Sequence, residues 1–187
     1  MAESEKPSVR KQIPPRRWLP PLLVGLGGIL LLSAALLLFM QNRPAAGFPR
    51  VGQRMADFSL LDLNGREVHL SDYAGRTVLI NAWATWCPPC QAEMPLLVQE
   101  YELRKASGFT ILAINDGETR EEAAAFAREY GLTFPVLLDT DAVLLDSMLI
   151  DNLPTTLVVG ADGLVKAVHV GVLSPEVFAA EIAPHLP

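Results

Sequence analysis

Cysteine and histidine are scarce in this chain of 187 residues, which holds two cysteines and three histidines. A tetrahedral zinc site needs four ligands, and His69, His169 and His185 are spread widely along the sequence. Covalent haem attachment needs a histidine directly after the second cysteine of a Cys-x-x-Cys pair, and Gln91 occupies that position. We therefore expect neither a zinc site nor a covalently bound haem.

Several kinds of sequence pattern are also missing. The chain has no internal repeat, no low-complexity tract and no motif for a flavin or nicotinamide, so we expect no cofactor. From residue 18 onward, 10 Lys and Arg stand against 19 Asp and Glu, a net charge near −9. This acidic balance argues against nucleic acid or an anionic membrane surface as a partner.

One segment near the N-terminus is strongly apolar. Residues 18–42 contain no charged side chain. A helix over residues 22–40, at about 1.5 Å per residue, is about 28 Å long, close to the hydrocarbon thickness of a bilayer. Five Lys and Arg precede this segment and only Arg43 follows it closely. We therefore expect a transmembrane helix over 18–42, with the basic residues 1–17 in the cytoplasm.

A cleaved signal peptide is the alternative interpretation of this segment. Residues 33–35 (Ser-Ala-Ala) could serve as a cleavage site, but cleavage there would leave the apolar residues 36–40 at the new terminus. An uncleaved anchor is therefore favoured. In either case we expect the later domain, residues 53–187, on the extracytoplasmic (periplasmic) side of the cytoplasmic membrane, joined by a tether over 43–52.

Beyond the tether the sequence alternates between strand and helix patterns. The expected strands cover 58–63, 67–70, 77–83, 109–115, 134–138, 156–159 and 165–170, and the expected helices cover 87–105, 119–130, 142–149 and a last stretch beginning at Pro175. Asn64-Gly65 predicts a hairpin with a type I′ turn, Thr119 and Glu122 predict a capping box, and Pro95 predicts a bend. The alternation indicates an α/β domain with a mainly parallel sheet covered on both faces.

Both cysteines lie in the segment Trp86-Cys87-Pro88-Pro89-Cys90, directly after the apolar strand 77–83. A Cys-x-x-Cys pair at a strand-to-helix junction is typical of a thiol–disulfide redox site. The N–H groups and the dipole at a helix N-terminus lower the pKa of a thiol, so we expect Cys87 to be exposed and to attack. Cys90, one turn later, would resolve the mixed disulfide. Pro88 removes one N–H group that could stabilise the Cys87 thiolate, which should make the pair more reducing.

A purely structural disulfide is the main alternative in an exported domain. A bridge that closes so short a loop restricts the unfolded chain little, so the redox interpretation is favoured. Glu93 lies three residues after Cys90, on the same helical face. If it is buried, its pKa is raised and it could pass protons to and from the thiols; the alternative is a solvated helix glutamate.

The segment 81–90 resembles the active site of the thioredoxin superfamily, and Leu153-Pro154-Thr155 resembles the cis-proline loop of that family. The N-terminal anchor, the hairpin and an extra strand–helix segment within 108–138 favour its membrane-anchored extracytoplasmic branch, the ResA, TlpA and CcmG (DsbE) type. Cytoplasmic members carry a buried aspartate where Asn81 stands. The resemblance implies a thioredoxin-like fold, with a central mixed sheet flanked by helices.

The resemblance also implies a function. It identifies a thiol–disulfide oxidoreductase that reduces disulfides of exported proteins such as apocytochrome c, or of copper-site assembly proteins, with electrons from a membrane thiol donor. Its implied site residues are Cys87, Cys90 and Glu93 as catalytic groups, with Cys87–Cys90 as the redox disulfide, and Trp86, Pro88, Pro154 and Thr155 at the substrate. A thiol peroxidase of the same fold, a disulfide-donating oxidant and a non-catalytic binding module remain as alternatives.

Overall fold

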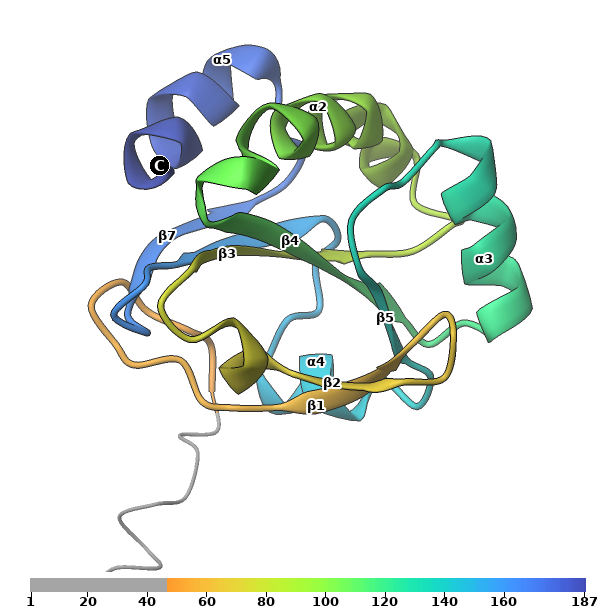
Figure 1. Cartoon of the computed structure of the whole chain (residues 1–187). Coiled ribbons are helices and arrows are strands. Elements are labelled where there is room, and N and C mark those ends of the chain that lie inside the picture. The colour runs from red at the N-terminus through yellow and green to blue at the C-terminus, as the bar shows by residue number, and fades with distance from the viewer. Residues whose placement is uncertain (1–46) are drawn as a thin grey trace, which may run out of the picture. The chain divides into compact units, whose positions relative to one another are not determined.

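The computed structural model describes residues 47–187 (Figure 1). The predicted cytoplasmic segment 1–17 and the predicted transmembrane segment 18–42 lie outside the described residues. Within residues 47–187, no helix combines the length and the apolar character that crossing a bilayer requires.

The core of the domain is one mixed sheet with the strand order β2-β1-β5-β4-β3-β6-β7. The strands are β1 (Ser59–Asp62), β2 (Glu67–His69), β3 (Thr77–Trp83), β4 (Phe109–Asp116), β5 (Val136–Asp139), β6 (Thr155–Val159) and β7 (Val165–Val170). β4 runs parallel to β3 and β5, and the other neighbouring pairs are antiparallel. The mixed sheet is therefore confirmed, whereas the mainly parallel sheet expected from the alternation is wrong, because an antiparallel hairpin extends the sheet at each edge.

Helical segments cover both faces of this sheet (Figure 1). They are η1 (Leu70–Tyr73), α2 (Pro88–Arg104), η2 (Lys105–Ser107), α3 (Arg120–Glu129), α4 (Val143–Ser147) and α5 (Pro175–Val177), which continues through a π-helical turn, η3 (Phe178–Ile182), and a 3₁₀ turn, η4 (Ala183–His185). α2 runs without a break through Pro95, and the capping box of α3 is confirmed. α2 and α5 lie on one side of the sheet and α4 on the other (Figure 1).

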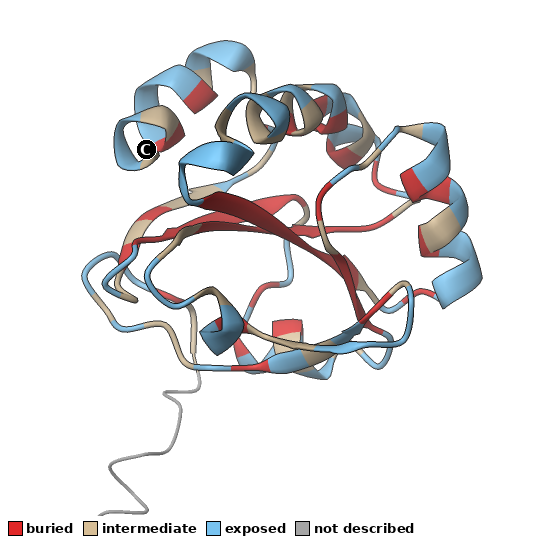
Figure 2. Cartoon of the chain, in the orientation of Figure 1, coloured by how far each residue is buried: buried red, intermediate tan, exposed pale blue. Residues whose placement is uncertain are grey.

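The central strand β3 shows how the two faces are built. Its residues are buried from Val78 onward (Figure 2). Leu79 and Trp83 belong to the hydrophobic cluster that contains α2 residues, while Val78 and Ile80 belong to the cluster on the opposite face. Since successive side chains of a strand point to opposite faces, Asn81 points to the α2 face.

The turn of the N-terminal hairpin differs from the predicted type I′ turn. That type needs a positive φ at both central residues, and of the predicted pair only Gly65 has one, at 78°. The Asp62 carbonyl accepts the Gly65 N–H at 2.9 Å, and its carboxylate accepts the N–H groups of Asn64 and Arg66 at 2.8 and 2.9 Å. The prediction is wrong because Asp62 satisfies the donors of a three-residue loop.

The segment that enters the domain is paired with the hairpin formed by β6 and β7. The N–H of Gly52 donates to the Val165 carbonyl at 2.8 Å, and the N–H of Val165 donates to the Gln53 carbonyl at 2.9 Å. The Met55 N–H donates to the Gly163 carbonyl at 3.0 Å. The chain thus enters the sheet at the end of β6 and the start of β7, which is the end remote from the cysteines.

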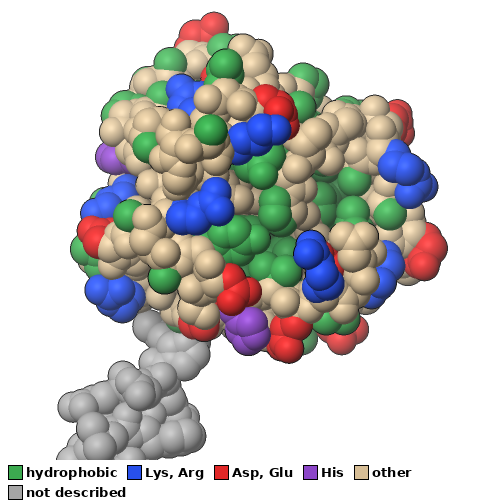
Figure 3. All heavy atoms as spheres, viewed as in Figure 1, with side chains coloured by type: hydrophobic (Ala, Val, Ile, Leu, Met, Phe, Trp, Pro, Cys, Tyr) green, Lys and Arg blue, Asp and Glu red, His purple; other side chains and the backbone are tan. Residues whose placement is uncertain are grey.

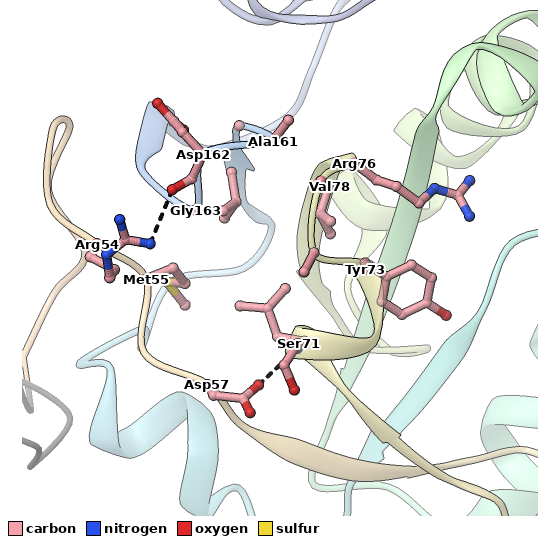
Figure 4. Close-up of a pocket in the computed structure, with 15 residues that line it drawn as sticks. Arg54, Met55, Asp57, Ser71, Tyr73, Arg76, Val78, Ala161, Asp162 and Gly163 are labelled. Carbon is pink, nitrogen blue, oxygen red and sulfur yellow. Dashed lines mark hydrogen bonds between the residues drawn. The ribbon is translucent and has the colours of Figure 1, made fainter.

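A cavity of about 240 Å³ lies beside this entry segment (Figure 4). Arg54 donates to the Asp162 carbonyl at 3.0 Å, and the Asp57 carboxylate accepts the N–H of Ser71 at 2.9 Å. Val78 and Val159, at the ends of β3 and β6 that lie away from Cys87, line it. The cavity contains none of the predicted site residues, so we do not assign the chemistry to it.

The face of the domain seen in Figure 3 has a mixed charge. Hydrophobic side chains gather in a hollow at its centre, and side chains of both signs surround the hollow (Figure 3). This face presents no continuous basic surface of the kind that binds a nucleic acid backbone.

Candidate active site

The two cysteines form a disulfide at the N-terminus of α2. Their sulfur atoms are 2.07 Å apart and their Cα atoms 5.3 Å apart. Cys87 is the N-cap residue, and its sulfur accepts the Cys90 N–H at 3.3 Å. Pro88 and Pro89 occupy the first helical positions, where a backbone N–H would have no intrahelical partner. The predicted helix start is confirmed.

The disulfide is largely covered. Cys90 is fully buried, and Cys87 is 4% exposed because it packs into the cluster that also holds Trp83 and Ala84. The expectation of an exposed Cys87 is therefore wrong for the disulfide form. Trp86, in contrast, is 66% exposed.

Glu93, on α2, is buried, with 1% of its surface exposed. Its Oε1 accepts the side-chain amide of Asn81 at 2.7 Å, and its Oε2 accepts the backbone N–H of Leu173 at 2.8 Å. The interpretation of Glu93 as a solvated helix glutamate is thereby excluded. Each carboxylate oxygen has one donor, from β3 on one side and from the segment after β7 on the other.

The surroundings of Glu93 change its acidity. Burial raises the pKa of this carboxyl, and the hydrogen bonds from Leu173 and Asn81 and the charge of His169 offset the rise only in part. A carboxyl with a raised pKa holds and releases a proton closer to neutral pH than an ordinary glutamate does. Because Cys90 lies one turn earlier on the same face of α2, Glu93 is placed to serve that thiol.

Asn81 links this carboxyl to the neighbouring strand. Its amide donates to Glu93 and also to the Thr156 hydroxyl, at 3.1 Å. Asn81 Oδ1 is buried, and no partner for it lies within the described part of the chain. Asn81 is therefore part of the Glu93 site.

A second carboxylate, which the sequence analysis missed, holds the turn before the cysteines. Glu118 Oε2 accepts the Thr85 N–H at 2.7 Å and the Asn115 amide at 2.6 Å, and Oε1 accepts the Thr85 hydroxyl. Gln91 donates from α2 to the Thr85 carbonyl at 2.7 Å. Polar residues at the carboxyl end of a strand parallel to β3 were the available signal, because parallel strands end at the same edge of a sheet.

The predicted substrate-contacting residues divide into two pairs. Trp86 and Pro88 are exposed beside the disulfide. Pro154 follows a cis peptide bond, as expected, and its carbonyl accepts the Gly171 N–H at 2.8 Å. Pro154 and Thr155 are buried, and the Thr155 hydroxyl donates to the Asn152 carbonyl at 2.6 Å. Both residues are therefore buried, with the Pro154 carbonyl and the Thr155 hydroxyl hydrogen-bonded within the fold.

No group of three or more His, Cys, Asp or Glu side chains suited to a metal ion occurs within residues 47–187. The disulfide, the buried carboxyl of Glu93 and the turn at Thr85, which is hydrogen-bonded to Glu118, form one site at the carboxyl ends of β3 and β4. Its chemistry is that of a dithiol–disulfide pair with a buried carboxyl nearby.

Comparisons with known proteins agree with this chemistry. The model of the AhpC/TSA family matches residues 51–168. Thiol-disulfide oxidoreductase ResA of Geobacillus kaustophilus is 41% identical over 126 residues, which cover 67% of this chain and 72% of that protein. Thiol-disulfide oxidoreductase ResA of Bacillus subtilis is 37% identical over 155 residues, which cover 82% and 87%.

A solved structure shares the fold as well. The thiol:disulfide interchange protein of Chlorobium tepidum TLS, a thioredoxin family protein, is 28% identical with a TM-score of 0.62, and the match covers 78% of this chain and 98% of that one. The thioredoxin-like fold expected from the cysteine motif is therefore confirmed. The chain belongs to the AhpC/TSA family and is a thiol–disulfide oxidoreductase of the ResA type.

Proposed function

We propose that this protein is a membrane-anchored reductant of disulfides in exported proteins. Residues 18–42 anchor it in the cytoplasmic membrane, residues 1–17 stay in the cytoplasm, and the thioredoxin-like domain works on the extracytoplasmic side. The single observation that carries the proposal is the Cys87–Cys90 disulfide at the N-terminus of α2 with the buried carboxyl of Glu93 one turn away.

The reaction begins from the reduced pair. The Cys87 thiolate attacks one sulfur of the substrate disulfide, and the other substrate sulfur leaves as a thiolate and takes up a proton. Glu93 accepts the proton of the Cys90 thiol, and the Cys90 thiolate then attacks the Cys87 sulfur. The second substrate sulfur leaves and is protonated in turn. The substrate has gained two electrons and two protons, and the protein holds the Cys87–Cys90 disulfide.

A membrane thiol donor then returns two electrons to the pair. The substrates are extracytoplasmic proteins with accessible disulfides, of which apocytochrome c before haem attachment is the first candidate and copper-site assembly proteins the second. The similarity to proteins named thiol-disulfide oxidoreductase ResA supports this class of reaction. Exposed Trp86 and Pro88 would contact the substrate. Peroxide reduction is not favoured, because Ile80 and Ala84 occupy the positions of Pro and Thr in the Pro-x-x-x-Thr-x-x-Cys pattern.

The midpoint potential of the cysteine pair tests the direction of the reaction. The protein is equilibrated with graded thiol buffers at pH 7, and the oxidised fraction is measured. A value at or below about −230 mV supports the reductant, whereas a value near about −120 mV makes the protein a disulfide donor. A pair that does not cycle reversibly contradicts the proposal altogether.

Trapping tests the order of attack. Cys90→Ser should accumulate a mixed disulfide between Cys87 and the substrate, because the resolving thiol is missing. Cys87→Ser should form no adduct and show no exchange. Accumulation of the adduct in Cys87→Ser instead would reverse the assigned roles.

A further inference from the structure

A row of polar side chains crosses three strands beneath α2. Asn81 on β3 pairs in register with Thr156 on β6, and Thr156 pairs with His169 on β7. The row starts at Glu93, which accepts the Asn81 amide. Residues of the same alternation on these strands, such as Val158 and Ala167, belong to the cluster on the α2 face, so the row lies on that face.

The outer end of the row reaches the surface. His169 Nδ1 lies 2.9 Å from Glu181 Oε2. The His169 side chain is 16% exposed and the Glu181 side chain 52%. Hydrogen bonds thus connect Glu93, Asn81 and Thr156 at the buried end and His169 with Glu181 at the outer end, and the strand register places Thr156 beside His169.

The charged groups around the row are few. Glu93 accepts hydrogen bonds from the Asn81 amide and the Leu173 N–H, and Cys90 lies one turn before it on α2. The C-terminal helical segment that packs near β7 carries the titratable residues Glu176, Glu181 and His185, and Glu176 is hydrogen-bonded to the Ser174 hydroxyl at 2.8 Å. When His169 is protonated, its charge lowers the pKa of Glu93.

We propose that His169, held in place by Glu181, is a positioning residue that controls the protonation of Glu93 during thiol–disulfide exchange. This inference rests on the proposed role of Glu93 as the proton acceptor for Cys90. Histidine is the side chain that gains and loses a proton between pH 5 and 8. An imidazolium near Glu93 favours the carboxylate, the form that accepts the Cys90 proton.

The pH profile of exchange tests the inference. His169→Gln removes the positive charge, so Glu93 stays protonated to a higher pH and the acid limb of the rate profile should move up by about half to one pH unit. At pH 6 the rate should fall by about 3- to 10-fold, and near pH 8.5 it should match that of the parent chain. His185→Gln, a histidine in the C-terminal segment with no role in the row, is the matched control and should leave the profile unchanged.

Two further variants separate this inference from the proposed function. Glu93→Gln should remove the acid limb, and adding His169→Gln to it should change nothing more. If Glu93→Gln removes the limb but His169→Gln does not move it, the inference fails and the proposed function stands. If Glu93→Gln itself leaves the limb in place, the proton role of Glu93 fails and the inference with it.

A direct titration removes any dependence on turnover. In the full-length oxidised protein, the carboxyl carbon of Glu93 is followed by ¹³C NMR between pH 4 and 9. Its titration midpoint should move to higher pH in His169→Gln and move the same way, by less, in Glu181→Gln. Identical midpoints in all three proteins would overturn the inference, even if the His169 variants lost activity through a change in folding.

Discussion

At the scale of single residues, the ionisation of Glu93 is subject to two opposing effects. Its carboxyl is buried, which disfavours the charge, yet it accepts two hydrogen bonds that favour the charge. The pKa of Glu93 is raised, so the folded protein holds this proton more tightly than the unfolded chain does. Ionising Glu93 therefore costs stability as the pH rises from the unfolded pKa through the folded one.

The consequence is a stability difference that depends on pH. Replacing Glu93 with Gln removes the ionisation. The free energy of unfolding of Glu93→Gln, compared with that of the parent chain, should therefore increase as the pH rises from 4 to 8. The gain should be on the order of 1 kcal/mol. Urea unfolding of both oxidised proteins at several pH values measures it, and a constant difference across this range would contradict the raised pKa.

Glu118 serves a different purpose at the same scale. Its carboxylate is the acceptor for the Thr85 N–H, the Thr85 hydroxyl and the buried Asn115 amide. Glu118→Ala should therefore lower the free energy of unfolding by about 2–3 kcal/mol, because these donors lose their acceptor. Glu121→Ala, an exposed glutamate in the first turn of α3, is the control and should cost less than about 1 kcal/mol. Equal losses in the two variants would show that the hydrogen bonds accepted by Glu118 do not stabilise the fold.

At the scale of elements, the first turn of α2 sets the chemistry of the cysteines. Pro88 stands directly after Cys87 and supplies no N–H to its sulfur, while the Cys90 N–H lies 3.3 Å from it. A thiolate at this N-cap is thus stabilised by the helix with two donors fewer than an ordinary first turn offers, because Pro88 and Pro89 both lack an N–H. A less stable thiolate makes the dithiol form a stronger reductant.

Pro88→Ala tests this element. Restoring the N–H should stabilise the Cys87 thiolate and raise the midpoint potential by about 30–60 mV, since a hydrogen bond to a charged group is worth about 1.5–3 kcal/mol and about 30 mV corresponds to 1.4 kcal/mol. Equilibration with thiol buffers at pH 7 measures the change. Pro95→Ala, two turns into the same helix, is the control for a general effect of proline. An unchanged or lower potential in Pro88→Ala would exclude the missing donor as a cause.

At the scale of the whole molecule, the entry segment ties the N-terminal side of the domain to the sheet. Residues 52–55 hydrogen-bond to Gly163 and Val165, and Phe48 and Met55 pack against the hydrophobic cluster opposite α2. The predicted tether over 43–52 therefore includes residues, from 47 onward, that are bonded to the domain. The segment acts as part of the fold.

Removing this segment should destabilise the domain. A chain that begins at Phe58 should unfold with about 3–5 kcal/mol less free energy than one that begins at Gly47, through lost backbone hydrogen bonds and lost apolar burial. Guanidinium unfolding of the two oxidised chains measures the difference. Equal midpoints would show that residues 47–57 only lie on the surface of a complete domain.

Several elements could be predicted because their signals are local. The bounds of β3 match the apolar run 77–83, and Thr119 with Glu122 marks the start of α3. The strand expected over 134–138 is instead Val136–Asp139. Its end is fixed by the Asp139 carboxylate, which accepts the N–H groups of Leu144 and Leu145 in α4, a contact that periodicity does not reveal.

The sequence by itself determined the cysteine pair, its place at a strand-to-helix junction and the helical face that carries Glu93. Each of these depends on residues within one or two turns of one another, so spacing and caps suffice. The tertiary structure decided the mixed order of the strands, the burial of Cys87 and the partners of the carboxylates. The Leu173 N–H reaches Glu93 from 80 positions away and Thr85 reaches Glu118 across 33. Such pairs form only when the sheet brings distant segments together. A buried carboxylate needs hydrogen-bond donors, and the topology of the fold determines which donors lie beside it.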